Sequence, residues 1–146
     1  MIVAAKPTRM RLWASALAAA GLLIACTPQD LDDAPVEVCR DPATTCVLSN
    51  GMSLQTRGTP RTLSPIELSV RDVPVSVTEV RVEASMSGME MPPVGVVLRN
   101  SGPSEWTGQL ILPVCSRGRS DWRWTLVTRV GSGVQRTTVA VEAAPP

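Results

Sequence analysis

The chain has 146 residues with 14 basic and 13 acidic side chains, so no charge dominates and nucleic acid is not an expected partner. It contains no histidine, phenylalanine or tyrosine, and its four tryptophans supply every aromatic ring. The lack of histidine excludes Ser-His and Cys-His nucleophilic pairs, a histidine general base, and histidine-based zinc or Cu(II) sites. We therefore expect a protein that is not an enzyme.

The first 25 residues have the layout of a secretory signal peptide. Three basic residues come first, and the uncharged run 12–25 that follows is shorter than the roughly 20 residues of a membrane-spanning helix. The stretch 23–26, Leu-Ile-Ala-Cys, resembles the bacterial lipobox, which implies that Cys26 carries a lipid and anchors the chain in the cell envelope. Because Thr27 follows the cysteine where an aspartate would favour inner-membrane retention, we expect the outer membrane, with the protein facing the periplasm.

The part of the chain after the signal peptide is long enough for one domain. Removal of residues 1–25 leaves 121 residues with a net charge of −2. Residues 26–36 contain the lipidated cysteine and a polar, proline-bearing segment, which we interpret as a flexible tether. Residues 37–146 are expected to form the folded domain.

Short runs in which apolar and polar residues alternate occupy this domain. The clearest lie at 66–71, 79–84, 106–112, 122–126 and 136–142, and weaker ones at 47–56 and 94–99. Period-two alternation is typical of half-buried strands, and turn-forming residues such as Asn-Ser-Gly-Pro at 100–103 separate the runs. About seven short strands predict an all-β fold, a single immunoglobulin-like antiparallel β-sandwich. Trp122 and Trp124 share one parity, so we expect both in its core.

Three cysteines remain besides Cys26, an odd number in an oxidising compartment. A bridge between Cys39 and Cys46 closes a loop of eight residues and would stabilise the fold by about 2.5 kcal/mol in the chain-entropy model. Their proximity in sequence favours this pairing, which leaves Cys115 as a free thiol. The alternative, in which Cys115 is bridged to one of the other two, stays open.

Three methionines cluster in segment 86–93, Met-Ser-Gly-Met-Glu-Met-Pro-Pro. Met86 continues the inward parity of the preceding run, so we expect it in the core. Met89 and Met91 would point to one face of an extended chain, with Cα atoms about 6.6–7 Å apart. Thioether and thiolate sulfurs suit Cu(I), and Cys115 would supply a third sulfur if its loop lies at the same end of the domain. The alternatives are that these methionines fill the core or form a partner-binding surface.

The order of these segments resembles the YtkA-like and FixH-like group of small exported β-domains, over about residues 50–142. The similarity lies in the Met-x-Met-Pro segment, an aromatic-x-Gly strand and a late Gly…Trp strand, at positions Met89, Met91, Pro92, Gly108, Gly118 and Trp122. The resemblance implies an immunoglobulin-like sandwich with a role in copper handling or oxidase assembly. Because this chain has no histidine, it implies a sulfur-based Cu(I) site rather than a Cu(II) site.

Two functions of different classes follow from the sequence. The first is a lipid-anchored, non-enzymatic envelope protein that binds Cu(I) through Met89, Met91 and Cys115. The second is a metal-free interaction or structural module that binds another envelope protein. Arg117 and Arg119 follow Cys115 on a turn that we expect to be solvated, or else to act on the thiol through their charge.

Overall fold

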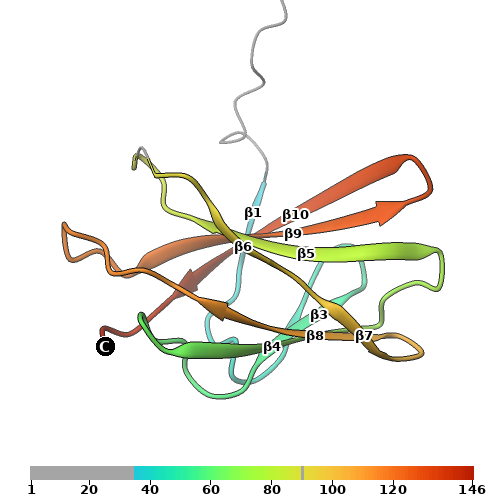
Figure 1. The fold of residues 1–146 in the computed structure, drawn as a ribbon, viewed down its shortest axis with the longest axis horizontal. Helices are drawn as coiled ribbons and strands as arrows, with labels where there is room; N and C mark the ends of the chain where they lie inside the picture. Colours follow the sequence, from blue (N-terminus) through green and yellow to red (C-terminus); the bar gives the residue numbers. More distant parts are fainter. Residues whose placement is uncertain (1–34, 90) are drawn as a thin grey trace, which may run out of the picture.

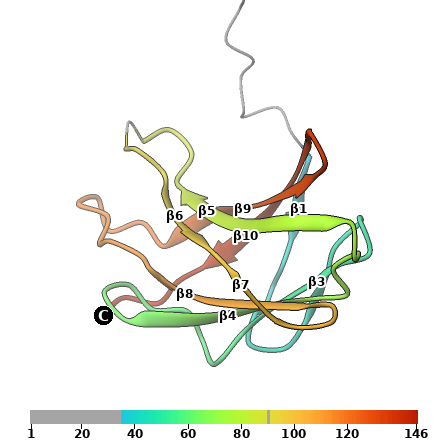
Figure 2. The same ribbon diagram turned by 45° about the vertical axis from the view of Figure 1, so that its right-hand side comes forward.

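A computed structural model describes residues 35–89 and 91–146, and in these residues it contains ten strands and no helix. The strands form two five-stranded sheets that pack face to face (Figure 1, Figure 2). The expected all-β sandwich is therefore confirmed, although its strands outnumber the seven that alternation indicates. The expected signal peptide, the expected lipidation site Cys26 and most of the expected tether lie outside the described residues. No helix in the described part is long and apolar enough to cross a membrane.

Each sheet combines long central strands with short edge strands. The first sheet has the order β1 (Val36–Val38), β10 (Gly133–Glu142), β9 (Asp121–Val130), β5 (Val77–Ser85) and β6 (Val94–Val97). The second has the order β2 (Cys46–Val47), β3 (Ser53–Thr56), β4 (Pro65–Arg71), β8 (Glu105–Ile111) and β7 (Arg99–Gly102). All pairs are antiparallel except β1 with β10, which run parallel.

The long strands follow the alternation of the sequence. In β9, Trp122 and Trp124 are each only 1% exposed, as predicted, and in β5 every second residue from Val80 to Ala84 is buried. Ala84 lies opposite Trp124 in the register of β5 and β9, so a small side chain faces a large one. Burial of such apolar surface between the sheets is the main stabilising contribution to the fold. Trp106 is only partly buried and packs against this core.

One segment crosses from the first sheet to the second. β6 and β7 are separated by a single residue, Leu98, which is 2% exposed and lies over β8. A Cβ atom at Gly108 of β8 would lie 2.7 Å from Leu98 Cδ2, so any other residue at this position would force Leu98 to shift. The sequence indicated a strand at 94–99 and a turn at 100–103. That expectation was wrong at Asn100 and Ser101, because these polar residues form an exposed edge strand.

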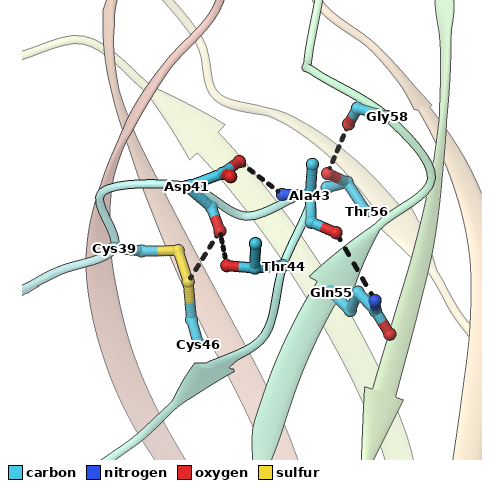
Figure 3. The surroundings of a disulfide bond; sticks show 8 residues. All are labelled: Cys39, Asp41, Ala43, Thr44, Cys46, Gln55, Thr56 and Gly58. Carbon is cyan, nitrogen blue, oxygen red and sulfur yellow. Dashed lines mark hydrogen bonds between the residues drawn. A yellow bond between two sulfur atoms is a disulfide. The ribbon is translucent and has the colours of Figure 1, made fainter.

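The N-terminal arm joins the two sheets through the predicted disulfide. β1 pairs with β10 in the first sheet and β2 pairs with β3 in the second, and the Cys39–Cys46 disulfide connects the two strands. The Cα atoms of the two cysteines are 5.6 Å apart. Asp41 stabilises the loop between them by accepting the N–H of Ala43 at 3.0 Å (Figure 3). β1 begins at Val36, so regular structure starts one residue before the expected boundary at 37.

Four segments meet at one end of the sandwich, which we call the sulfur end: 57–64, 86–89, 112–120 and 143–146. Backbone hydrogen bonds join three of them, from Leu63 N–H to Leu112 O at 2.8 Å and from Ala143 N–H to Ser120 O at 3.0 Å. Segment 86–89 is joined to 112–120 by a hydrogen bond from the Arg119 side chain to the carbonyl of Ser87. Figure 1 shows the β5–β6 and β8–β9 connections projecting at this end, on the left of the view. The register of the central strands therefore brings together loops that are distant in sequence.

Candidate metal centre

Two turns at the sulfur end carry the candidate ligands. The first turn follows β5 and is closed by a hydrogen bond from Met89 N–H to Met86 O at 3.4 Å. Gly88 occupies its third position with φ of 68°, a left-handed conformation that glycine adopts without steric cost. The second turn follows β8 and is closed by a hydrogen bond from Gly118 N–H to Cys115 O at 3.0 Å. Met89 ends the first turn, and Cys115 begins the second.

The structure brings one predicted pair of sulfurs into contact. The Cys115 thiol donates to the Met89 thioether with 3.3 Å between the two sulfur atoms. Cys115 is a free cysteine with 5% exposure, and Met89 is half-buried against the hydrophobic core. The condition placed on Cys115, that its loop lies at the same end as the methionines, is therefore met.

The other two methionines of the cluster have different environments. Met86 is 4% exposed and belongs to the core, as its parity indicated. Met91 is half-buried and packs against the same core, but it is not part of the contact between Met89 and Cys115. The three sulfurs predicted to act together are thus present as one contacting pair and one neighbour two residues along the chain.

Arg119 connects the two turns. Its Nη1 donates to the carbonyl oxygen of Ser87 at 2.7 Å, and its Nε donates to Asp121 Oδ1 at 2.8 Å. Nη2 forms an ion pair with the second carboxylate oxygen of Asp121. Arg119 stays partly exposed, as expected for a solvated loop, and in addition it contacts the turn that ends at Met89. Arg117, two residues earlier, is exposed.

Charge around the turns strengthens this arrangement. The hydrogen bond that Arg119 donates to Asp121 raises the pKa of the Arg119 guanidinium above its ordinary value, and the nearby Cys115 contributes in the same direction. The hydrogen bond from Arg119 lowers the pKa of Asp121 below its ordinary value, with a smaller Coulombic contribution from Arg123. Both groups therefore stay charged across the physiological pH range.

The donors of this site are soft. A thiol and a thioether prefer Cu(I), whereas zinc and Cu(II) sites use imidazole, several thiolates or oxygen ligands. Within the described residues, no group of three or more His, Cys, Asp or Glu side chains is placed to hold a metal ion. The residues present thus fit a soft monovalent ion and offer little to a harder one.

A separate hollow of about 500 Å³ lies on the outer face of the second sheet. The ion pairs Arg57–Glu67 and Arg71–Glu105, each 3.0 Å long, line it. Hydrogen bonds from Arg71 and then Ser69 lower the pKa of Glu105. Its charged groups are satisfied by one another, and its lining contains no sulfur atom, so it is distinct from the site at the sulfur end.

Comparison with protein-family models, with curated proteins and with solved structures found no match. The site is therefore interpreted from its own residues. The sequence contained a partial signal for Arg119, since Asp121 lies two residues away. It contained none for Ser87, because a backbone carbonyl 32 residues away has no signature in the sequence.

Proposed function

We propose that this protein is a lipid-anchored, non-enzymatic component of the bacterial cell envelope that binds one Cu(I) ion at its sulfur end. The contact of 3.3 Å between Cys115 Sγ and Met89 Sδ is the observation that carries the proposal. Two soft donors from turns 26 residues apart meet at a partly buried position, in a chain that offers no imidazole. Met91 is the candidate for a third sulfur.

The proposed location in the cell is inferred from the sequence alone. The signal-peptide layout and the lipobox resemblance at Cys26 favour a lipid anchor, and Thr27 favours the outer membrane with the domain facing the periplasm. A tether that ends where β1 begins would hold the domain close to the membrane surface. Copper handling or oxidase assembly is the role implied by the resemblance to YtkA-like and FixH-like domains, with Cu(I) as cargo.

The two ligands would form different kinds of bond to the Cu(I) ion. Cys115 would provide the strong bond, since its thiol loses a proton when it binds a metal. Met89 would provide a neutral sulfur whose flexible side chain adapts to the ion. The low exposure of Cys115 would limit contact with water and oxidants. Such a site suits reversible binding of a soft ion rather than chemistry on a substrate.

Cu(I) titration of the mature lipoprotein in detergent micelles, against a weak chromogenic Cu(I) chelator without oxygen, tests the proposal. We expect one Cu(I) per chain and little affinity for Cu(II). Met89→Leu and Cys115→Ser should each weaken binding by at least about tenfold, because each removes one sulfur from a low-coordinate site. Met91→Leu should do the same if Met91 is a ligand.

Met52→Leu provides the matched control for these variants. Met52 is 3% exposed and comes directly before β3. The first residue of β3 pairs with Arg71, which lies at the other end of β4 from Pro65. Met52 is therefore at the end of the sandwich opposite the sulfur end. Leucine keeps a similar volume, so this variant removes a sulfur from the core and should leave Cu(I) binding unchanged. Absence of Cu(I) binding, or binding that survives both Met89→Leu and Cys115→Ser, would overturn the proposal.

A metal-free interaction module is the second candidate, and one observation favours it. Leu63, Ile111 and Val114 are 61%, 56% and 50% exposed near the sulfur end. Leu63 also has φ of 59°, which is unusual for a bulky residue and points to a functional constraint. If Cu(I) does not bind, this apolar surface would contact another envelope protein.

A further inference from the structure

We infer that Arg119 is a clasp that positions Met89 over Cys115, so that the two sulfurs are held together before an ion arrives. The inference deepens the proposed Cu(I) site and takes its functional meaning from it. The geometry at Arg119 is nevertheless independent of any metal, because the guanidinium contacts a backbone carbonyl and a carboxylate of the protein.

One side of the clasp is fixed to a central strand. Asp121 is the first residue of β9 and lies opposite Glu142 of β10 in the register of the first sheet. Its carboxylate accepts two N–H groups of Arg119, from Nε and Nη2, which sets the plane of the guanidinium. The backbone of Asp121 forms the end pair of the ladder between β9 and β10, so this anchor belongs to the sheet.

The other side of the clasp holds the methionine turn. Arg119 Nη1 reaches the carbonyl of Ser87, the second residue of the turn that ends at Met89. The turn's own closing hydrogen bond, from Met89 to Met86, is long at 3.4 Å. The hydrogen bond from Arg119 is shorter, at 2.7 Å, and charge-assisted. It is therefore the stronger of these two hydrogen bonds on the turn that ends at Met89.

Arginine suits this role better than lysine does. The planar guanidinium donates in fixed directions to a carboxylate and to a third group at once, whereas an ammonium is a point charge on a flexible stem. Arg119 uses three N–H groups in this way. A site whose ligands are already in place loses less conformational freedom on binding, so the clasp would raise the affinity for the ion.

The rate at which Cys115 is alkylated in the absence of metal tests whether Arg119 holds Met89 over the thiol. In the mature lipoprotein Cys26 carries the lipid under the proposed anchoring and Cys39 is bridged to Cys46, so Cys115 is the one thiol left to react. If Arg119 holds Met89 over the thiol, Arg119→Gln should speed alkylation by iodoacetamide by about five- to tenfold, by freeing the turn to open. Arg119→Lys should give an intermediate rate.

The direction of this change separates two roles of Arg119. A guanidinium that acts on the thiol only through its positive charge favours the reactive thiolate, so its removal would slow alkylation. Arg117→Gln is the matched control, since it removes an exposed arginine from the same loop and should change the rate less than about twofold. An unchanged or slower rate in Arg119→Gln would overturn the clasp.

A second variant and a second readout complete the test. Asp121→Asn releases the guanidinium from β9 while Arg119 remains, and should change alkylation in the same direction by a smaller factor; no change there would also contradict the clasp. Arg119→Gln should in addition weaken Cu(I) binding by about tenfold. If the wild type binds Cu(I) and Arg119→Gln binds it equally well, the clasp is wrong and the site stands. If the wild type binds no Cu(I), the proposed Cu(I) site is wrong, and the alkylation rates alone then test whether Arg119 positions Met89.

Discussion

Replacement of Gly108 by alanine should destabilise the sandwich, whereas the same replacement at Gly102 should not. The new Cβ at Gly108 would lie 2.7 Å from Leu98 Cδ2 and 3.5 Å from Val96 Cγ2. At Gly102 the nearest atom, Glu105 Cβ, would be 3.8 Å away, an ordinary contact distance. Each residue lies on a strand of the second sheet, so the pair isolates the crossing of Leu98 over β8.

The expected cost follows from how little room Leu98 has to move. Its side chain is 2% exposed, so the clash can be relieved only by shifts in the core. Overpacking of this kind costs about 1–3 kcal/mol. Loss of glycine from the unfolded chain returns about 0.4–1 kcal/mol. We therefore expect Gly108→Ala to lower the free energy of unfolding by about 1–2 kcal/mol, which lowers the melting temperature by about 4–8 °C.

Urea unfolding followed by tryptophan fluorescence measures these changes, since Trp122 and Trp124 are buried in the core. Leu98→Val removes the Cδ2 atom, so the double variant with Gly108→Ala should be more stable than the sum of the single effects, by at least about 0.5 kcal/mol. Equal stability of Gly108→Ala and Gly102→Ala, or strict additivity with Leu98→Val, would refute this account of the crossover strand.

The remaining predictions concern the disulfide, the core, the pH dependence of copper binding and of the contact between Arg119 and Asp121, and the anchor. Replacing Cys39 and Cys46 by serine should lower the free energy of unfolding by about 2.5 kcal/mol in urea, and peptide mapping of the unreduced wild type should find this bridge and a free Cys115. Trp122→Ala should cost about 3–5 kcal/mol by the same assay, and a loss below about 1 kcal/mol would contradict its place in the core. Because binding displaces the thiol proton, Cu(I) affinity should fall by up to about tenfold for each unit by which the pH is lowered. In the folded protein the pKa of Asp121 is lowered from the ordinary value of 3.8. Its contribution to stability is therefore fully present above pH 3.8 and is lost as the pH falls through the lower pKa of the folded state. Arg119 should consequently stay bound to Asp121 at about pH 5. Cys26→Ala should move the protein from the membrane pellet to the soluble fraction, whereas a wild type found in the soluble fraction would contradict the anchor.

The alternation of the sequence predicted the central strands because its cause is local. Successive side chains of a strand point to opposite faces, so Val80 and Trp124 could be assigned to the core from their neighbours alone. The edge strands were not predicted in the same way. Val36–Val38 is short and at most half-buried, and Arg99–Gly102 is short and largely exposed, so their sequences resemble tether and turn. Only pairing with β10 and β8 makes them strands.

The sequence predicted the ligand chemistry of the candidate site. It predicted the geometry only on the condition that the Cys115 loop lies at the same end of the domain as the methionines. The sulfur atoms and the missing imidazole can be read from composition, and Met89 and Cys115 were proposed together on that basis. Their contact depends on the register of two sheets, which places the turn after β5 beside the turn after β8. The hydrogen bond from Arg119 to the Ser87 carbonyl could not be predicted from the sequence, because its acceptor is a backbone atom that every residue type carries.

X-ray absorption at the copper edge of the Cu(I)-loaded protein tests the central claim most directly, because it identifies the atoms bound to the ion. We predict a shell of sulfur atoms only, with a low coordination number and one sulfur fewer in the Met89→Leu variant. Met52→Leu should leave the spectrum unchanged, since Met52 lies in the core at the opposite end of the sandwich. A shell of nitrogen or oxygen atoms, or a sulfur shell unaffected by Met89→Leu, would contradict a copper site built on Met89 and Cys115.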